Sequence, residues 1–383
     1  MILTGLDQLV SASKPKFSGR LGLVSHSAAV THSLTDSVSA LLSAGYNLTA
    51  LFGPEHGLTS SAADGAAVDH ATDSRTGLPV YSLYGKTREP SPDMLSGIDT
   101  LLLDIQDVGV RFYTYISTMY YCLTGCAKAN KKLIILDRPN PINGVAIEGP
   151  MLEDDLTSFV GIFNIPVRHG LTMGELALLM VGQHQIPVEL EIVKMLGWDR
   201  SMWFDQTGLT WVPTSPGMPH LSTATVYPGT CFIEGTNLSE GRGTALPFEL
   251  IGSPWIDAFT LSDGLNDLNL PGVQFRPSTF TPSASKHAGY ICQGVQIHVL
   301  DRQVFRPVET GLHMVQMIKN TCPNQFEFLA SSWEGKPPHF DLLCGTSTVR
   351  TSIENQSGIE KEIASWRPHL ESFITTRQPY LLY

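Results

Sequence analysis

The stretch Leu101–Tyr115, which reads LLLDIQDVGVRFYTY, decides the fold that we expect for this chain. Its apolar start predicts a buried strand, and Asp104, Asp107 and Arg111 follow where that strand ends. In an open α/β sheet, ligands bind beyond the carboxyl ends of the strands. We therefore predict a site for a polar, hydroxyl-rich substrate at this edge. The alternative is that Asp107 and Arg111 only pair with each other and cap the loop.

Two other segments show the same pattern of a strand that ends in polar residues. Residues 47–52 (NLTALF) run into Glu55 and His56, with glycines on both sides that let the backbone turn sharply. Residues 132–136 (KLIIL) run into a third polar group. Because equivalent ends of parallel strands meet at one edge of a sheet, the repetition strengthens the prediction of a site. The third group consists of Asp137, Arg138 and Asn140.

The order of the expected elements predicts the fold class. Strand and helix patterns alternate through the first half of the chain, which is typical of a mainly parallel sheet with right-handed crossovers. From about Ser253 the pattern changes to strands at 273–280 and 294–300 and helices at 310–319 and 358–373. We therefore predict an α/β protein. Its mainly parallel sheet domain is expected at 1–252 and a smaller α+β domain at 253–383.

The composition excludes several classes of protein. With 25 Lys and Arg against 36 Asp and Glu, the net charge is −11, so no basic stripe is available for nucleic acid. No apolar run is long enough to cross a bilayer. The N-terminus has no secretory signal pattern, so the chain as given is expected to be cytoplasmic. The six cysteines form no metal-binding pattern, and we expect buried free thiols and no metal site.

A glycine-rich loop at 235–250 (GTNLSEGRGTALPFEL) is a second candidate for ligand binding. Glycines flank Glu240 and Arg242, so backbone N–H groups and a guanidinium could converge on an anion. The loop is not a Walker motif, and no glycine fingerprint of dinucleotide-binding folds stands near the start of the chain. No nucleotide or other cofactor is therefore expected.

The many carboxylates at expected strand ends, without a cofactor motif, fit acid/base hydrolysis of a glycosidic bond. This chemistry needs one protonated carboxylic acid for the leaving group and a second group that stabilises or traps the oxocarbenium-like centre. The residue types alone do not rank the acids for these roles, and they leave an esterase or a phosphatase open. The candidates are Glu55, Asp104, Asp107, Glu234 and Glu240.

Long motifs along the chain resemble the bacterial exo-β-N-acetylmuramidase family, the NamZ family, formerly the domain of unknown function DUF1343. They include FGPEHG at 52–57, DIQDVGVRFYTYISTM at 104–119, LDRPNPING at 136–144, RHGLTMGELA at 168–177 and EGTNLSEGRGTALPFE at 234–249. The resemblance covers about Leu21 to Tyr383. It implies a Rossmann-like domain, a smaller C-terminal domain and an active cleft between them. It also implies release of N-acetylmuramic acid from the non-reducing end of peptidoglycan fragments.

The resemblance further implies roles for single residues. Glu55 would be the catalytic acid/base, with His56 beside it and Asp104 and Glu234 as further catalytic candidates. The lactyl group of muramic acid is a carboxylate, so a bidentate arginine, Arg111 or Arg242, is its expected partner. The residues implied in substrate binding are Asp107, Arg111, Tyr113, Arg138, Asn140, Arg168, His169, Asn237, Glu240 and Arg242.

Two other functions stay open beside this one. A catalytically idle sugar- or muropeptide-binding protein would keep the arginines and aromatic residues but would not need an acid of raised pKa. A hydrolase of another acidic sugar or of an ester would share the same scaffold. The chain also has His26 and Gly217 where the family pattern often has Asn. Family members are commonly exported, whereas this chain shows no signal, and the sequence does not give the oligomeric state.

Overall fold

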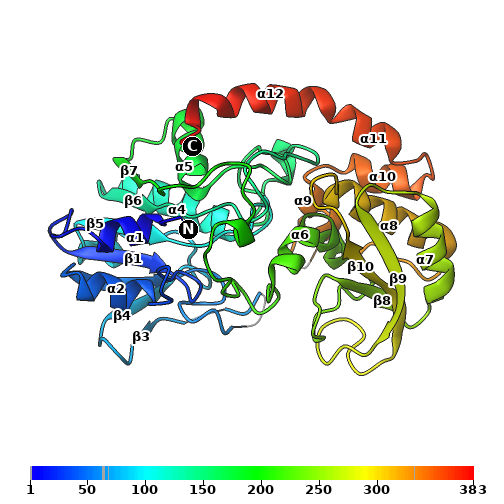
Figure 1. Cartoon of the computed structure of the whole chain (residues 1–383), viewed down its shortest axis with the longest axis horizontal. Helices are drawn as coiled ribbons and strands as arrows, with labels where there is room; N and C mark the ends of the chain where they lie inside the picture. Colours follow the sequence, from blue (N-terminus) through cyan, green and yellow to red (C-terminus); the bar gives the residue numbers. More distant parts are fainter. Residues whose placement is uncertain (1, 63–64, 68, 332) are drawn as a thin grey trace.

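A seven-stranded sheet organises the first half of the chain (Figure 1). The computed structural model describes residues 2–62, 65–67, 69–331 and 333–383. The strand order is β3-β4-β2-β1-β5-β6-β7, and neighbours run parallel except β3 and β4. This confirms the mainly parallel sheet that the sequence predicts. The strands are β1 Leu21–Ser25, β2 Leu48–Gly53, β3 Ala71–Thr72, β4 Pro79–Ser82, β5 Thr100–Asp104, β6 Lys132–Leu136 and β7 Leu190–Val193.

Strand β5 lies in the interior of this sheet, where side chains on both faces of the strand are buried, and its side chains are apolar on both faces. It pairs with β1 on one side and with β6 on the other. Leu101 and Leu103 pack into the core beneath α4 and α5, whereas Leu102 packs on the opposite face, against residues of α1 and α2. The helices of this N-terminal unit are α1 Gly5–Val10, α2 Ser37–Ser43, α3 Pro92–Ser96, α4 Tyr115–Lys128 and α5 Met173–His184.

The C-terminal unit contains a smaller antiparallel sheet. Its order is β8-β10-β9; α7 packs against β9 and β10, and α8 packs against α7. The expected boundary after residue 252 cuts through β8, and α6 already packs on α8. We infer that the C-terminal unit begins near α6. Its elements are α6 Leu221–Thr230, β8 Leu250–Ser253, α7 Ala258–Asp267, β9 Val273–Phe280, β10 Cys292–Val299, α8 Pro307–Thr321, α9 His339–Cys344, α10 Thr348–Glu354 and α11 Glu360–Ser365.

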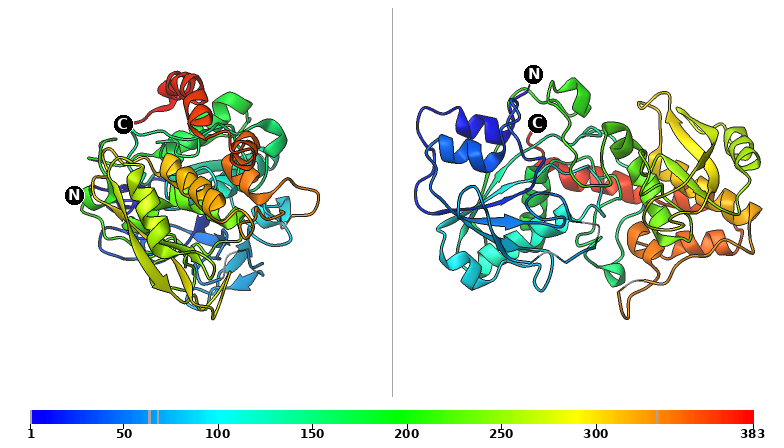
Figure 2. Two further views of the ribbon diagram at one scale, coloured as in Figure 1. Left: turned by 90° about the vertical axis from the view of Figure 1, so that its right-hand side faces the viewer. Right: turned by 90° about the horizontal axis from the view of Figure 1, so that it is seen from below.

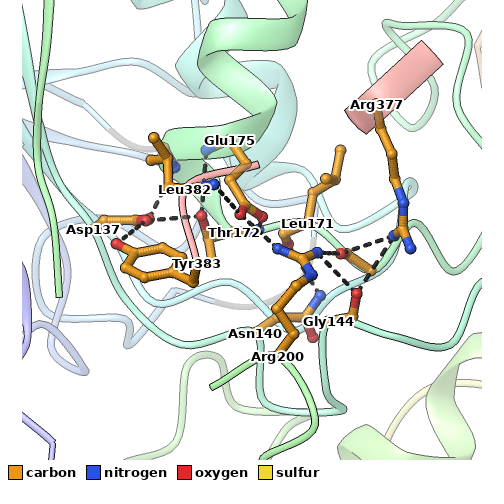
Figure 3. A network of polar contacts seen from close by, with 12 residues as sticks. Asp137, Asn140, Gly144, Leu171, Thr172, Glu175, Arg200, Arg377, Leu382 and Tyr383 are labelled. Atoms are coloured by element: carbon orange, nitrogen blue, oxygen red, sulfur yellow. Dashed lines mark hydrogen bonds and ion pairs between the residues drawn. The ribbon is translucent and has the colours of Figure 1, made fainter. Parts of the chain in front are cut away.

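The last helix returns to the N-terminal unit. Helix α12, Arg367–Arg377, spans both units, and the C-terminus lies beside α5 (Figures 1 and 2). Tyr383 then donates a hydrogen bond of 2.8 Å from its hydroxyl to Oδ2 of Asp137 (Figure 3). We call α12 and the tail to Tyr383 the C-terminal strap. Among the helices in the described part of the chain, none has both the length and the apolar character that a membrane crossing needs.

Candidate active site

A cleft of about 750 Å³ lies between the two units, and each unit contributes predicted site residues to its lining. It collects predicted residues that are far apart in the sequence. These are Glu55, His56 and Tyr113 from the N-terminal unit, and Glu234, Glu240 and Arg242 from the C-terminal unit. A second hollow, of about 820 Å³, lies beneath the C-terminal strap and is lined by none of the predicted site residues. We therefore place the candidate site in the first cleft.

Glu55 stands just beyond the carboxyl end of β2, at the wall of the cleft. Its Oε1 accepts a hydrogen bond of 3.0 Å from the backbone N–H of Gly65, and its Oε2 accepts one of 2.5 Å from the hydroxyl of Thr114. The residue is only 8% exposed. Two donors from different segments thus fix a largely buried carboxyl group that still reaches the cleft, which is the arrangement that a positioned acid requires.

His56 follows directly in a tight turn. Its φ is +69° and that of Gly57 is +75°, so two consecutive residues adopt the left-handed conformation that glycine tolerates best. Its Nδ1 lies 2.9 Å from the carbonyl oxygen of Ala62. The turn therefore places Glu55 and His56 side by side at the end of the strand.

Two neighbouring tyrosines are held by Thr214, and one of them, Tyr113, reaches the cleft. Tyr113 shares a hydrogen bond of 2.6 Å with the hydroxyl of Thr214, and Tyr115 donates one of 2.6 Å to the Thr214 carbonyl oxygen. Burial raises the pKa of both phenols, so they stay neutral. Tyr113 lines the cleft and can offer a hydroxyl to a sugar.

The C-terminal wall carries a cluster of two acids and two cations. Nη2 of Arg242 lies 2.6 Å from Oε1 of Glu234, and its Nε lies 3.5 Å from Oε1 of Glu240. Nζ of Lys286 lies 2.9 Å from Oε2 of Glu240. The Arg242 guanidinium also covers the Phe248 ring at 4.9 Å from the centroid. This cluster can receive an anionic group by exchanging one carboxylate for another.

Models of exo-beta-N-acetylmuramidase NamZ match nearly the whole sequence: the N-terminal model matches residues 21–222 and the C-terminal model residues 225–383. The chain belongs to the NamZ family. It is 48% identical over 384 residues to the peptidoglycan beta-N-acetylmuramidase NamZ of Bacillus subtilis (strain 168), covering 100% of this chain and 91% of that protein.

Two crystal structures of DUF1343 family proteins from Bacteroides fragilis NCTC 9343 share this fold. The first superimposes with a TM-score of 0.90 at 38% identity and the second with a TM-score of 0.79 at 28% identity. Each similarity covers 100% of this chain and 99% of the other. The α/β architecture with its smaller C-terminal unit is thus shared with these two DUF1343 family proteins.

Other residues to which the NamZ resemblance gave roles lie outside the cleft. Asp104 and Arg138 form a bidentate ion pair, with Nε to Oδ1 at 2.6 Å and Nη2 to Oδ2 at 2.9 Å. Both side chains are buried, and burial raises the pKa of Asp104 although Arg138 opposes this shift. The pair joins the ends of β5 and β6, so we give it a structural role.

Arg111 is enclosed by main-chain oxygens. Nη1 donates to the carbonyls of Pro150 and Ile165, both at 2.8 Å, and Nη2 to those of Leu343 and Cys344 at 3.0 and 2.7 Å. The residue is 1% exposed, and burial lowers its pKa to about 10. Arg111 therefore ties the N-terminal unit to the end of α9 and does not reach the cleft, which leaves Arg242 as the candidate for a carboxylate.

Asp107 and His169 are buried behind the cleft. Oδ2 of Asp107 accepts a hydrogen bond of 2.7 Å from the N–H of Gly109 and lies 3.9 Å from Nε2 of His169. Burial raises the pKa of Asp107 to about 7 and lowers that of His169 to about 3. Within the described residues, no ion pair joins Asp107 to Arg111, so the alternative of a pair that caps the loop does not hold.

The three remaining residues bind backbone elsewhere. Nδ2 of Asn140 donates to the carbonyl of Leu171 at 3.0 Å, and Nδ2 of Asn237 donates to that of Gln325 at 2.6 Å. Arg168 donates to the carbonyl of Ile142. Each of these side chains holds one segment to another.

Two residues at the cleft, Lys286 and Thr114, are functional candidates that the sequence did not predict. Lys286 lies in the loop between β9 and β10, and nothing in that loop distinguishes this lysine from a surface one. Thr114 stands inside the stretch LLLDIQDVGVRFYTY, just before an expected helix. The helix start was the one signal that could have drawn attention to its hydroxyl.

Proposed function

We propose that this protein is an exo-acting β-N-acetylmuramidase, which releases N-acetylmuramic acid from the non-reducing end of peptidoglycan fragments. One observation carries the proposal. In a chain of the NamZ family, the carboxyl group of Glu55 and the guanidinium of Arg242 line the two sides of one cleft. The first supplies an acid and the second a partner for the lactyl carboxylate.

Glu55 acts as the general acid in this proposal. Its proton passes to the glycosidic oxygen while the bond from this oxygen to the anomeric carbon breaks, and the sugar develops oxocarbenium character. A water molecule then bonds to the anomeric carbon, and the proton that it releases replaces the one that Glu55 gave to the leaving group. Asp104 takes no part, because Arg138 holds it inside the sheet. Glu234 is the proposed second group, since it lines the cleft from the C-terminal unit and its side chain is 23% exposed.

Arg242 binds the lactyl carboxylate. Its guanidinium contacts Glu234 and Glu240, and Lys286 supplies a second positive charge beside Glu240. A carboxylate on the substrate can therefore be bound by exchange of partners, with Lys286 balancing the charge of Glu240. A neutral N-acetylglucosamine offers no such exchange, which makes the cluster a means of discrimination.

The test uses two disaccharides of opposite sequence, one with N-acetylmuramic acid and one with N-acetylglucosamine at the non-reducing end. We expect free N-acetylmuramic acid from the first only. Glu55→Gln should lower the rate by about 10²- to 10⁴-fold, the usual contribution of a general acid. Glu371→Gln, a surface carboxyl group on α12, is the matched control and should leave the rate unchanged.

The outcome separates the proposed function from its alternatives. Binding of the first disaccharide without any cleavage would indicate a sugar-binding protein and would refute the proposal. Cleavage of other acidic sugars or of esters in preference to the muramic acid compound would point to a different hydrolase.

A further inference from the structure

The carboxyl group of Glu55 is held at both of its oxygens. Thr114 reaches Oε2 at 2.5 Å and the N–H of Gly65 reaches Oε1 at 3.0 Å. Thr114 itself lines the cleft. The contact links the strand end that carries Glu55 to the first turn of α4, two segments about 60 residues apart.

The position of Thr114 in its helix makes this contact distinctive. A threonine at the N-cap normally accepts a hydrogen bond from a backbone N–H of the first turn. Thr114 occupies the N-cap of α4, yet its backbone is helical, with φ −63° and ψ −11°, and its side chain makes no cap hydrogen bond. A cap bond is commonly worth about 1 kcal/mol. The hydroxyl is thus directed to Glu55 rather than to its own helix.

The two donors also differ in what they can do. A backbone N–H can only donate, whereas a hydroxyl can donate or accept. Oε1 is therefore best kept as an acceptor, and the acid proton is best carried by Oε2. When Oε2 loses its proton to the leaving group, the Thr114 hydroxyl can donate to the new negative charge, and it can turn back when the proton returns.

We propose that Thr114 is a positioning residue that fixes the Glu55 carboxyl group and directs its acid proton to Oε2. This inference rests on the proposed function, because it assumes that Glu55 transfers a proton to the substrate. Thr114 acts through Glu55 and is not itself a catalytic residue.

The experiment compares Thr114→Val, which keeps the shape, with Thr114→Ser, which keeps the hydroxyl. On a disaccharide with non-reducing N-acetylmuramic acid, Thr114→Val should lower kcat by about 10- to 100-fold, as expected when a reacting group is slightly misplaced. KM should stay within about twofold, because the binding residues are untouched. Thr114→Ser should restore most of kcat.

A matched control exists on the same helix. Thr124 donates a hydrogen bond of 2.7 Å to Oε1 of Glu89, away from the cleft. Thr124→Val removes a bond of the same kind and should leave kcat unchanged. Calorimetric binding of free N-acetylmuramic acid should give equal affinities for the wild type and Thr114→Val, which excludes a general loss of structure.

Each result decides the matter. Wild-type kcat in Thr114→Val, or equal losses in the Val and Ser variants, would overturn the positioning role while the proposed function stands. A wild-type protein that releases no N-acetylmuramic acid would overturn the proposed function, and the role of Thr114 with it.

Discussion

Arg111 and Arg242 differ in what their guanidinium groups contact, and this difference decides what each substitution does. Arg111→Lys keeps the charge but loses the planar guanidinium, which donates hydrogen bonds to four carbonyl oxygens. We expect the free energy of unfolding to fall by roughly 2–4 kcal/mol in urea denaturation. The preference for muramic acid over glucosamine substrates should stay the same. A stable variant that loses this preference would contradict the structural role.

Gly217 leaves space for the guanidinium of Arg242. A Cβ at this position would lie 2.7 Å from Nη1 of Arg242 and 3.5 Å from the Phe248 ring. Gly217→Ala should therefore displace the arginine and raise KM for muramic acid substrates by about 10-fold, an effect of about 1.4 kcal/mol on binding, with little change in kcat. Gly97→Ala, where a Cβ would meet nothing within 4 Å, is the control. An unchanged KM would show that Arg242 does not bind the substrate.

Asp107 makes stability depend on pH. Burial raises its folded pKa to about 7 from the ordinary value of 3.8. The contribution of Asp107 to the free energy of unfolding is thus fully present below pH 3.8 and is lost as the pH rises through about 7. Three pKa units correspond to about 4 kcal/mol at most.

The substitution Asp107→Asn removes this titration. The stability of the variant relative to wild type should rise by several kcal/mol between pH 4 and pH 8, up to about 4 kcal/mol. Denaturation curves at both pH values measure the change. The same substitution at Asp155, an exposed acid, should change the relative stability between these pH values much less. A pH-independent difference for Asp107→Asn would mean that Asp107 is ionised throughout this range.

At the scale of the element, the ends of the parallel strands were predictable and the directions of their side chains were not. Alternating strands and helices predict the sheet edge where Glu55 and Tyr113 lie. The sequence does not reveal that Asp104 turns into the sheet toward Arg138. It also cannot show that Arg111 is enclosed by carbonyls of residues 343 and 344, more than 200 positions away. Such contacts exist only after the two units have come together.

The C-terminal strap is attached to the N-terminal unit through its last residues. Leu382 donates its N–H to Oε1 of Glu175 at 2.9 Å (Figure 3). Arg377 donates to the carbonyls of His169 and Gly170 at 3.1 and 3.0 Å. The hydroxyl of Tyr383 donates a hydrogen bond to the buried carboxyl group of Asp137. Burial raises the pKa of Asp137 to about 6. The tail thus fastens the strap to the N-terminal unit.

Tyr383→Phe tests this attachment. The variant leaves Asp137 without one of its donors, and the free energy of unfolding should fall by about 1–2 kcal/mol, visible as a lower Tm. Tyr380→Phe is the matched control, since the hydrogen bond that its hydroxyl makes with Gln183 is long, at 3.5 Å. Equal Tm values for Tyr383→Phe and wild type would mean that the tail adds nothing to stability.

At the scale of the molecule, the cleft exists because two units are held at a fixed distance. Arg111 joins them inside, and the strap joins them outside. Glu55 comes from one unit and Arg242 from the other, so neither unit alone contains the whole site. The protein as a whole carries a net charge of −11, and at the cleft Arg242 and Lys286 are paired with Glu234 and Glu240.

The most direct test of the central claim compares Glu55→Gln and wild type on two substrates that differ only in their leaving group. One is the disaccharide with non-reducing N-acetylmuramic acid, and the other is an aryl β-N-acetylmuraminide whose acidic phenol leaves without a proton. If Glu55 is the general acid, the variant should lose about 10³-fold in kcat/KM on the disaccharide and less than about 10-fold on the aryl substrate. Equal losses on both substrates, or none on either, would contradict the account.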